Sequence, residues 1–241
     1  NFYNHFGFLI IVNVFNKKQC NDIKKRAYYL VDKDKSKKVT GFSLKKNNHH
    51  ESKNFLSSAY KINSFYEDKM INKNGTFKDD KINCISKLGH CLHDNDSVFI
   101  KFSYHKKIQE LIKLINLNKP ILNQSSYIFK QPFIGGEYLW HQDSSYLLTF
   151  PLSCVAFWVA IDDANEKNGT LIVKPQSHKE KLRKRVKYVK GKIIKENLIE
   201  KEWDEENNLT LCVKSGSIVI FNGSIAHKSS ENLSDHSRNT Y

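Results

Sequence analysis

Residues 136–143 read GEYLWHQD, a short run of β-prone residues that follows the Gly135-Gly136 turn and ends in a histidine and an aspartate two positions apart. From residue 121 onward, similar runs alternate with turn residues such as Asn168-Gly169. Short strands at this spacing predict an antiparallel β-sandwich or barrel. The runs cover residues 127–129, 138–140, 155–161, 171–173, 209–213 and 218–221.

The residues before position 121 carry a pattern typical of helices. Asn16 is a candidate N-cap, and apolar residues follow it every three or four positions, at Cys20, Ile23, Ala27, Leu30 and Val31. The same spacing predicts helices over residues 82–92 and 108–115, the second with Ser103 as N-cap. An apolar run at residues 7–15 predicts a first strand.

No stretch between these two parts has the composition of a linker. We therefore expect one domain over residues 1–241, with helical support mostly in residues 16–120 and the β-core mostly in residues 121–241. Two segments break the pattern. Residues 32–52 are rich in lysine and predict a mobile loop that leaves His49 and His50 in solvent, and residues 179–208 form a charged insertion.

Lysine and arginine outnumber the acidic residues by 39 to 25, so the chain carries a net charge of +14. This charge is typical of nucleic-acid-binding proteins. The lysines are nevertheless spread along the chain, and no basic stretch is interleaved with aromatic residues that could stack on bases. We therefore predict no specific nucleic-acid partner, and expect the positive field to attract a small anionic substrate.

Two further classes of protein are excluded by composition. No apolar run approaches the ~20 residues of a membrane-spanning helix. The five cysteines are scattered without a C-x-x-C pair, which excludes a thiolate zinc site of the usual spacing and favours reduced thiols. We expect a reducing compartment such as the cytoplasm, with an organelle such as the peroxisome as the alternative.

The His141-Gln142-Asp143 triplet is the strongest candidate for chemistry. In an extended segment, side chains two positions apart lie on the same face, so the imidazole and the carboxylate can reach one ion. His227, which follows the predicted strand at residues 218–221, can complete the set from a distant strand. Two histidines and one carboxylate form the facial triad of non-haem Fe(II) oxygenases, although zinc accepts the same ligands.

Arg238 follows His227 in a segment that is a candidate for the next strand. Facing the interior of a barrel, its planar guanidinium would bind a carboxylate and indicate a site for a 2-oxo acid. The alternative is a surface pair with an acidic residue such as Asp235. Spacing alone favours the surface pair.

Several motifs in a fixed order resemble the phytanoyl-CoA dioxygenase family. The resemblance spans residues 7–241. Its motifs are His141-Gln142-Asp143, residues 160–164 with Asn168-Gly169, residues 175–178, Gly216-Ser217, His227 and Arg238, with weaker echoes at residues 55–58, 83–93 and 124–132.

This resemblance implies a mainly β fold with flanking helices, in which a double-stranded β-helix (a cupin-like jelly roll) forms the core. It also implies an enzyme that uses Fe(II), 2-oxoglutarate and O₂ to hydroxylate a small anionic or acyl-type metabolite, with release of succinate and CO₂. The alternative is a module that binds metal and 2-oxoglutarate without turnover, as a sensor or scaffold.

By the same resemblance, each functional residue of the family is assigned a position in this chain. The metal ligands are His141, Asp143 and His227, and Arg238 binds the distal carboxylate of 2-oxoglutarate. Lys87, Trp158 and Ser229 occupy positions that contact this cosubstrate. The chain departs from the family pattern at Ser126, where a relative has a methionine.

The remaining histidines have simpler interpretations. His90 and His93 lie three positions apart on the helix predicted over residues 82–92, where a pair on the helix surface is expected. His178 lies in the turn at residues 175–178 and is assigned to hydrogen bonding within that turn.

Overall fold

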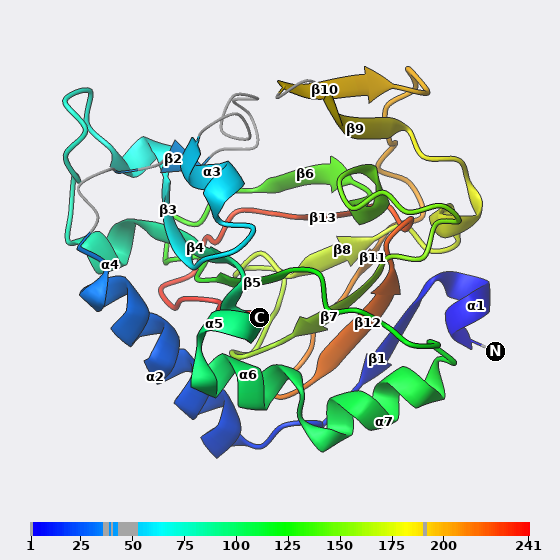
Figure 1. The fold of residues 1–241 in the computed structure, drawn as a ribbon, viewed down its shortest axis with the longest axis horizontal. Helices are drawn as coiled ribbons and strands as arrows, with labels where there is room; N and C mark the ends of the chain where they lie inside the picture. The colour runs from blue at the N-terminus through cyan, green and yellow to red at the C-terminus, as the bar shows by residue number, and fades with distance from the viewer. Residues whose placement is uncertain (1, 36–38, 40, 43–52, 190–191) are drawn as a thin grey trace.

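The computed structural model describes residues 2–35, 39, 41–42, 53–189 and 192–241. Most of the loop predicted over residues 32–52, including His49 and His50, lies outside these residues. In Figure 1 the strands occupy the middle of the molecule, and helices α2, α5, α6 and α7 lie along one side of them.

One four-stranded antiparallel sheet carries the histidines singled out from the sequence. Its strand order is β11 (Leu209–Thr210), β8 (Leu171–Val173), β13 (His227–Ser229) and β6 (Tyr138–His141). In the pairing of β13 with β6, His227 lies opposite His141. Residues that are far apart in the sequence are therefore neighbours in this sheet.

The remaining core strands form a second layer. Strands β1 (Phe8–Ile11), β12 (Ile218–Asn222) and β7 (Val155–Val159) make an antiparallel sheet. Another sheet contains β2 (Gly41–Phe42), β3 (Asn63–Glu67), β4 (Ile85–His90) and β5 (Ser125–Ile128), with only the β2–β3 pair parallel. Thr240 joins the two sheets, since it bridges to Ile128 on one side and to Ala160 on the other.

The helices of the first half support these sheets. Helix α2 (Lys17–Lys33) begins at Asn16, which forms a capping box with Gln19, and buries the predicted residues Cys20, Ile23, Ala27 and Val31. Helix α7 (Lys106–Leu114) is also confirmed, but its cap is His105; Ser103 is instead the last residue of α6 (Ser97–Ser103). The other helices are α1 (Phe2–Phe6), α3 (Lys53–Ser57), α4 (Lys81–Cys84) and α5 (Leu92–Asn95).

The helix predicted over residues 82–92 is wrong. Residues 82–84 belong to α4 and Leu92 begins α5, but residues 85–90 form strand β4 between β3 and β5. All six residues of β4 are buried, so the strand shows no alternation of apolar and polar side chains. Without that alternation, the spacing of the apolar residues could not distinguish a buried strand from a helix.

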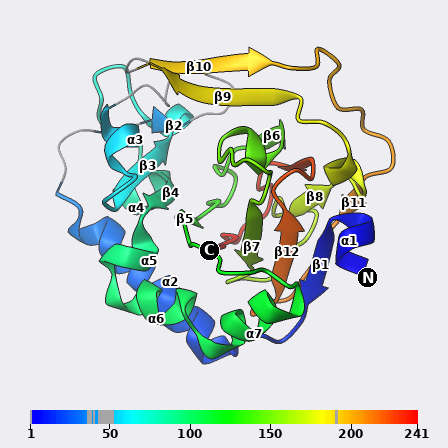
Figure 2. The same ribbon diagram turned by 45° about the vertical axis from the view of Figure 1, so that its right-hand side comes forward.

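The charged insertion at residues 179–208 contains an antiparallel hairpin of β9 (Lys184–Val189) and β10 (Lys192–Asn197). In Figures 1 and 2 this hairpin lies at the opposite side of the molecule from α2, α6 and α7. No helix among the described residues is long and apolar enough to cross a membrane.

Candidate active site

The three candidate metal ligands converge. His141 ends strand β6, Asp143 begins the turn that follows, and His227 begins strand β13. The Nε2 atoms of His141 and His227 lie 3.6 and 3.7 Å from Oδ1 of Asp143. These distances are too long for hydrogen bonds but short enough for all three atoms to reach one ion.

Backbone contacts orient both imidazoles. His141 Nδ1 lies 2.7 Å from the carbonyl oxygen of Leu139, and His227 Nδ1 lies 3.1 Å from that of Ile225. A carbonyl oxygen only accepts, so Nδ1 carries the hydrogen in each ring and the Nε2 lone pair points to the shared position. Burial and the nearby His141 lower the pKa of His227 to about 4, which keeps this imidazole neutral and able to bind metal at neutral pH.

Gln142, which lies between the candidate ligands His141 and Asp143, anchors the triplet to the core through its side chain. Its side chain is 2% exposed, its Nε2 donates to the carbonyl of Ser224, and its Oε1 accepts from the backbone N–H of Arg183. Because successive side chains point to opposite faces, this anchor turns His141 and Asp143 to the other face. In this chain the buried Gln142 therefore fixes the H-x-D triplet from the face opposite to its two candidate ligands.

One cavity of about 1840 Å³ contains this centre. All seven residues proposed from the sequence line it: His141, Asp143, His227, Arg238, Lys87, Trp158 and Ser229. We call its buried residues Lys87, Ser229 and Arg238 the inner end of the cavity. Lys87 and Arg238 come from β4 and the C-terminal segment, which β5 joins, since Ile128 pairs with Lys87 and with Thr240. Ser229 comes from β13 of the other sheet.

Arg238 faces the interior and is 2% exposed. Its guanidinium donates to Thr240 Oγ1 at 3.0 Å and to the carbonyl of Gly169 at 2.9 Å, and lies 5.5 Å from the ring centre of Trp158. Within the described part of the chain no carboxylate forms an ion pair with it, and its buried Nε has no hydrogen-bond partner. The surface pair with Asp235 is thus wrong; Asp235 contacts His236 instead.

Lys87 is buried on strand β4 rather than exposed on a helix. Its Nζ lies 3.0 Å from His90 Nε2, and burial lowers its pKa to about 7. His90 Nδ1 in turn lies 2.6 Å from Ser58 Oγ. His90 is therefore a buried residue of the cavity wall, and its prediction as a surface residue is wrong; His93 is also buried, against Ser125.

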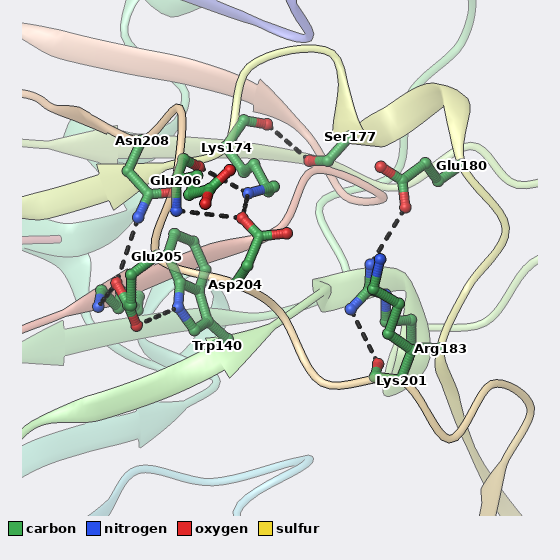
Figure 3. Close-up of polar contacts among 11 residues, drawn as sticks. Trp140, Lys174, Ser177, Glu180, Arg183, Lys201, Asp204, Glu205, Glu206 and Asn208 are labelled. Carbon is green, nitrogen blue, oxygen red and sulfur yellow. Dashed lines mark hydrogen bonds and ion pairs between the residues drawn. The ribbon is translucent and has the colours of Figure 1, made fainter.

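The outer wall of the cavity, residues 180–189 and 192–208, is held by surface contacts, some to the core and some within the wall itself. Figure 3 shows Trp140 donating to Glu205, Lys174 paired with Asp204, and Arg183 bonded to Glu180 and Lys201. Arg183 also lies over the ring of Trp203, 3.3 Å from its centre. No motif in the sequence indicated that this segment lines the cavity.

The sequence analysis also missed Lys130. This residue is 1% exposed and donates to Ser229 Oγ at 2.8 Å, although it does not itself line the cavity. In the sequence it is one of many lysines, and only its position within an otherwise apolar run marks it.

Comparison with known proteins places this site in a family. The family model described as phytanoyl-CoA dioxygenase (PhyH) matches residues 3–240. The chain belongs to the phytanoyl-CoA dioxygenase family. The resemblance identified from the sequence, and the prediction of a dioxygenase, are therefore confirmed.

Among relatives in this family, a phytanoyl-CoA dioxygenase of Arabidopsis thaliana is 34% identical over 241 residues, covering 100% of this chain and 84% of the plant protein. Phytanoyl-CoA dioxygenase domain-containing protein 1 of Danio rerio is 33% identical, covering 98% of this chain and 84% of the fish protein.

Solved structures confirm the predicted jelly-roll class. EctD from S. alaskensis with 2-oxoglutarate and 5-hydroxyectoine aligns with a TM-score of 0.64 at 15% identity, over 99% of this chain and 71% of EctD. The non-haem α-ketoglutarate-dependent carbocyclase SnoK aligns with a TM-score of 0.63 at 14% identity, over 99% of this chain and 79% of SnoK. The cofactors predicted for the phytanoyl-CoA dioxygenase family, iron and 2-oxoglutarate, are those of these neighbours.

Proposed function

We propose that residues 1–241 form one domain that binds Fe(II) and 2-oxoglutarate and uses O₂ to hydroxylate a small anionic or acyl-type metabolite, releasing succinate and CO₂. The observation that carries this proposal is a single cavity with two features. Two imidazole nitrogens and a carboxylate converge in it, and a buried guanidinium that no described carboxylate neutralises lines it.

The donor set fits Fe(II). The imidazoles of His141 and His227 and the carboxylate of Asp143 would hold the ion, and this donor set is the one that non-haem Fe(II) oxygenases use, with positions left open for cosubstrates. When bound, the iron and 2-oxoglutarate together supply the activation of O₂ and the oxidising chemistry. The protein holds His141 and His227 in the required tautomer through Leu139 and Ile225, before any ion arrives.

The inner end fits a dicarboxylate. A guanidinium is a planar fork that binds a carboxylate through two parallel hydrogen bonds, and burial strengthens such a contact. Thr240 and Gly169 fix the orientation of Arg238 from the protein side. Trp158 covers the guanidinium, while Lys87 and Ser229 supply further donors. In this arrangement Arg238 anchors the distal carboxylate of 2-oxoglutarate.

The rest of the cavity favours a substrate that is both apolar and anionic. Among the described residues, nine lysines or arginines line the cavity against three carboxylates, so it attracts anions. Apolar side chains such as Ile112, Ile121, Leu148 and Ile193 line it as well. A hydrocarbon body with a carboxylate or phosphate group matches both properties.

The test is a 2-oxoglutarate turnover assay under air, with succinate measured by mass spectrometry and a metabolite extract supplied as substrate. We expect succinate formation that requires Fe(II), rises with substrate, and disappears in Asp143→Ala. His236→Ala, which changes an exposed histidine paired with Asp235, is the matched control and should behave as the wild type.

Succinate formation that is unchanged by Asp143→Ala would remove the three ligands from the reaction. Tight binding of 2-oxoglutarate with no succinate on any fraction of the extract would instead identify a sensor or scaffold.

A further inference from the structure

Lys130 lies behind the inner end of the cavity in an unusual environment for a lysine. It follows strand β5 and is 1% exposed. Its Nζ donates to the carbonyl of Gly136 at 3.0 Å and to Ser229 Oγ at 2.8 Å, and lies 5.2 Å from the ring centre of Tyr138. No carboxylate among the described residues forms an ion pair with it. Burying an amine is costly, so these contacts require an explanation.

The backbone is shaped to hold this side chain. Lys130 itself has a φ of 35°, in the left-handed region that residues with a β-carbon rarely adopt. A β-carbon on Gly135 would lie 2.5 Å from Lys130 Cγ, and one on Gly169 would lie 2.5 Å from Lys130 Cε. Two glycines therefore leave the space that the lysine stem fills.

Gly169 contacts both Lys130 and Arg238. The carbonyl of Gly169 accepts from the Arg238 guanidinium, while its α-carbon lies against the stem of Lys130. Ser229 lies two residues beyond His227 on β13, which places both on the cavity face and about 7 Å apart along the strand. Ser229 is thus offset from the metal ligands by roughly the length of a five-carbon dicarboxylate.

The direction of the hydrogen bonds is determined by the partners. The carbonyl of Gly136 only accepts, so Lys130 donates one N–H there. It donates another to Ser229 Oγ, since an ammonium group has no lone pair with which to accept. Burial and Arg238 lower the pKa of Lys130, and Glu67, which accepts from the N–H of Gly136, opposes that shift. In either protonation state the amine keeps two N–H donors. Ser229 Oγ, already an acceptor, has its own hydrogen left for a second partner.

We propose that Lys130 is a positioning residue of the cosubstrate site: by donating to Ser229 Oγ, it turns the hydroxyl hydrogen of Ser229 toward the carboxylate that Arg238 binds. This inference rests on the proposed function, because it needs a dicarboxylate in the cavity. Lys130 acts entirely through Ser229, so the consequence of removing it depends on whether Ser229 is present.

A double-mutant cycle on cosubstrate binding tests this. Calorimetry measures the affinity of 2-oxoglutarate for the Mn(II)-loaded wild type, Lys130→Met, Ser229→Ala and the double variant, which avoids turnover. Methionine keeps an unbranched stem between the two glycines and removes the donor. We expect Lys130→Met and Ser229→Ala each to weaken 2-oxoglutarate about 10-fold, as loss of a hydrogen bond to a charged group does, and the double variant to match Ser229→Ala within twofold.

Two controls separate positioning from general damage. 2-Oxopentanoate, which has the same chain length but no distal carboxylate, should bind Lys130→Met and the wild type within twofold. Lys214→Met removes an exposed lysine paired with Asp163 and should leave the affinity for 2-oxoglutarate unchanged. If Lys130→Met does not fold, Lys130→Gln replaces it, and any loss it causes must again vanish in the Ser229→Ala background.

The outcomes are distinct. Wild-type affinity in Lys130→Met, losses that add in the double variant, or an equal loss for 2-oxopentanoate would each overturn the role of Lys130. Absence of any binding of 2-oxoglutarate to the wild type would overturn the proposed function itself.

Discussion

The inner end of the cavity and its outer wall hold their charged residues by different means. At the inner end, Arg238 and Lys87 are buried, and Arg238 is fixed by Thr240 and Gly169 in the core. In the outer wall, charges such as Arg185 and Lys187 are partly exposed and pair with Glu196 on the neighbouring strand of the hairpin. The first arrangement fixes an orientation, whereas exposed ion pairs contribute little to stability.

This difference separates two tasks within one cavity. Arg238, which forms no ion pair with a carboxylate of the described residues, keeps its affinity for a bound anion, because its burial excludes water as the alternative partner. Exposed charges on a hairpin attract a substrate and can change without disturbing the core. Substitutions at the inner end should therefore change the affinity for 2-oxoglutarate, the cosubstrate proposed for the whole family. Substitutions in the outer wall should instead change which substrate is preferred.

The largest effect is expected at the proposed metal ligands His141, Asp143 and His227, beside the inner end. His227→Ala should reduce Fe(II) affinity by more than about 100-fold, the upper limit for loss of a residue that merely supports a ligand. Equilibrium dialysis of iron against the wild type checks this, with His236→Ala as the exposed histidine control. Undiminished iron binding in His227→Ala would show that the converging atoms are not the binding site.

A smaller effect is expected when Arg238, the proposed cosubstrate anchor, is replaced. Arg238→Met should weaken 2-oxoglutarate by about 10- to 100-fold, since hydrogen bonds to charged groups contribute about 1.5–3 kcal/mol. The matched variant in the outer wall is Lys187→Met, which removes a cavity-lining lysine paired with Glu196. It should leave 2-oxoglutarate affinity unchanged and alter only the KM for substrate. Equal losses of 2-oxoglutarate affinity in both variants would contradict separate roles for the inner end and the outer wall.

The same division explains what could be predicted from the sequence. The helix with Cys20, Ile23, Ala27 and Val31 was predictable, because one buried face gives a clear period. The β-runs were predictable from β-prone residues bounded by turn residues. Strand β4 was not, because its apolar residues Ile85 and Leu88 fall at helical spacing and its other residues are not β-prone. That error placed Lys87 on a helix, although the family resemblance still gave it a role at the site.

Two features of the site depend on long-range contacts that leave no local pattern. Lys130 reaches Ser229 from 99 residues away, so its role follows only from the fold. The outer wall gave no motif at all, since its contacts join exposed polar residues such as Lys174 and Asp204. Arg238 could be predicted in part. Its spacing favoured a surface pair with an acidic residue, and only the family resemblance placed it in the cosubstrate site.

A pH-dependent effect of intermediate size is expected for Lys87. Its pKa is about 7 in the folded protein, below the value of a solvated lysine, so the unfolded chain binds more protons between pH 7 and about 10. The free energy of unfolding should therefore rise with pH in this window, by at most about 1.4 kcal/mol per pH unit from this group. Lys87→Met should lose that contribution.

Urea unfolding of the metal-free protein at pH 7, 8 and 9 measures the effect. The difference in unfolding free energy between Lys87→Met and the wild type should favour the variant most at pH 7 and shrink as the pH rises. Lys184→Met, in the exposed outer wall, supplies the lysine control, since its side chain is in water in both states. A difference for Lys87→Met that is constant with pH would contradict the burial of the amine.

The smallest effect is expected for Glu205, the residue at which the outer wall approaches the metal ligands. Glu205 accepts from Trp140 Nε1 at 2.9 Å and pairs with Lys228, and these two residues are the sequence neighbours of His141 and His227. Both partners hold the pKa of Glu205 below its usual range. Its side chain is nevertheless 65% exposed, so Glu205→Gln should destabilise the protein by no more than about 1 kcal/mol, or about 2–4 °C in Tm.

Iron and 2-oxoglutarate affinities decide whether that contact matters to the site. If the inner end and the metal ligands are held by the core alone, both affinities should stay within twofold of the wild type in Glu205→Gln, and only the KM for substrate should change. Glu180→Gln, which breaks an ion pair with Arg183 away from the ligand strands, is the matched control. A tenfold loss of iron affinity in Glu205→Gln but not in Glu180→Gln would show that the outer wall supports the metal ligands, because Gln142 and the backbone carbonyls would then be insufficient to orient them.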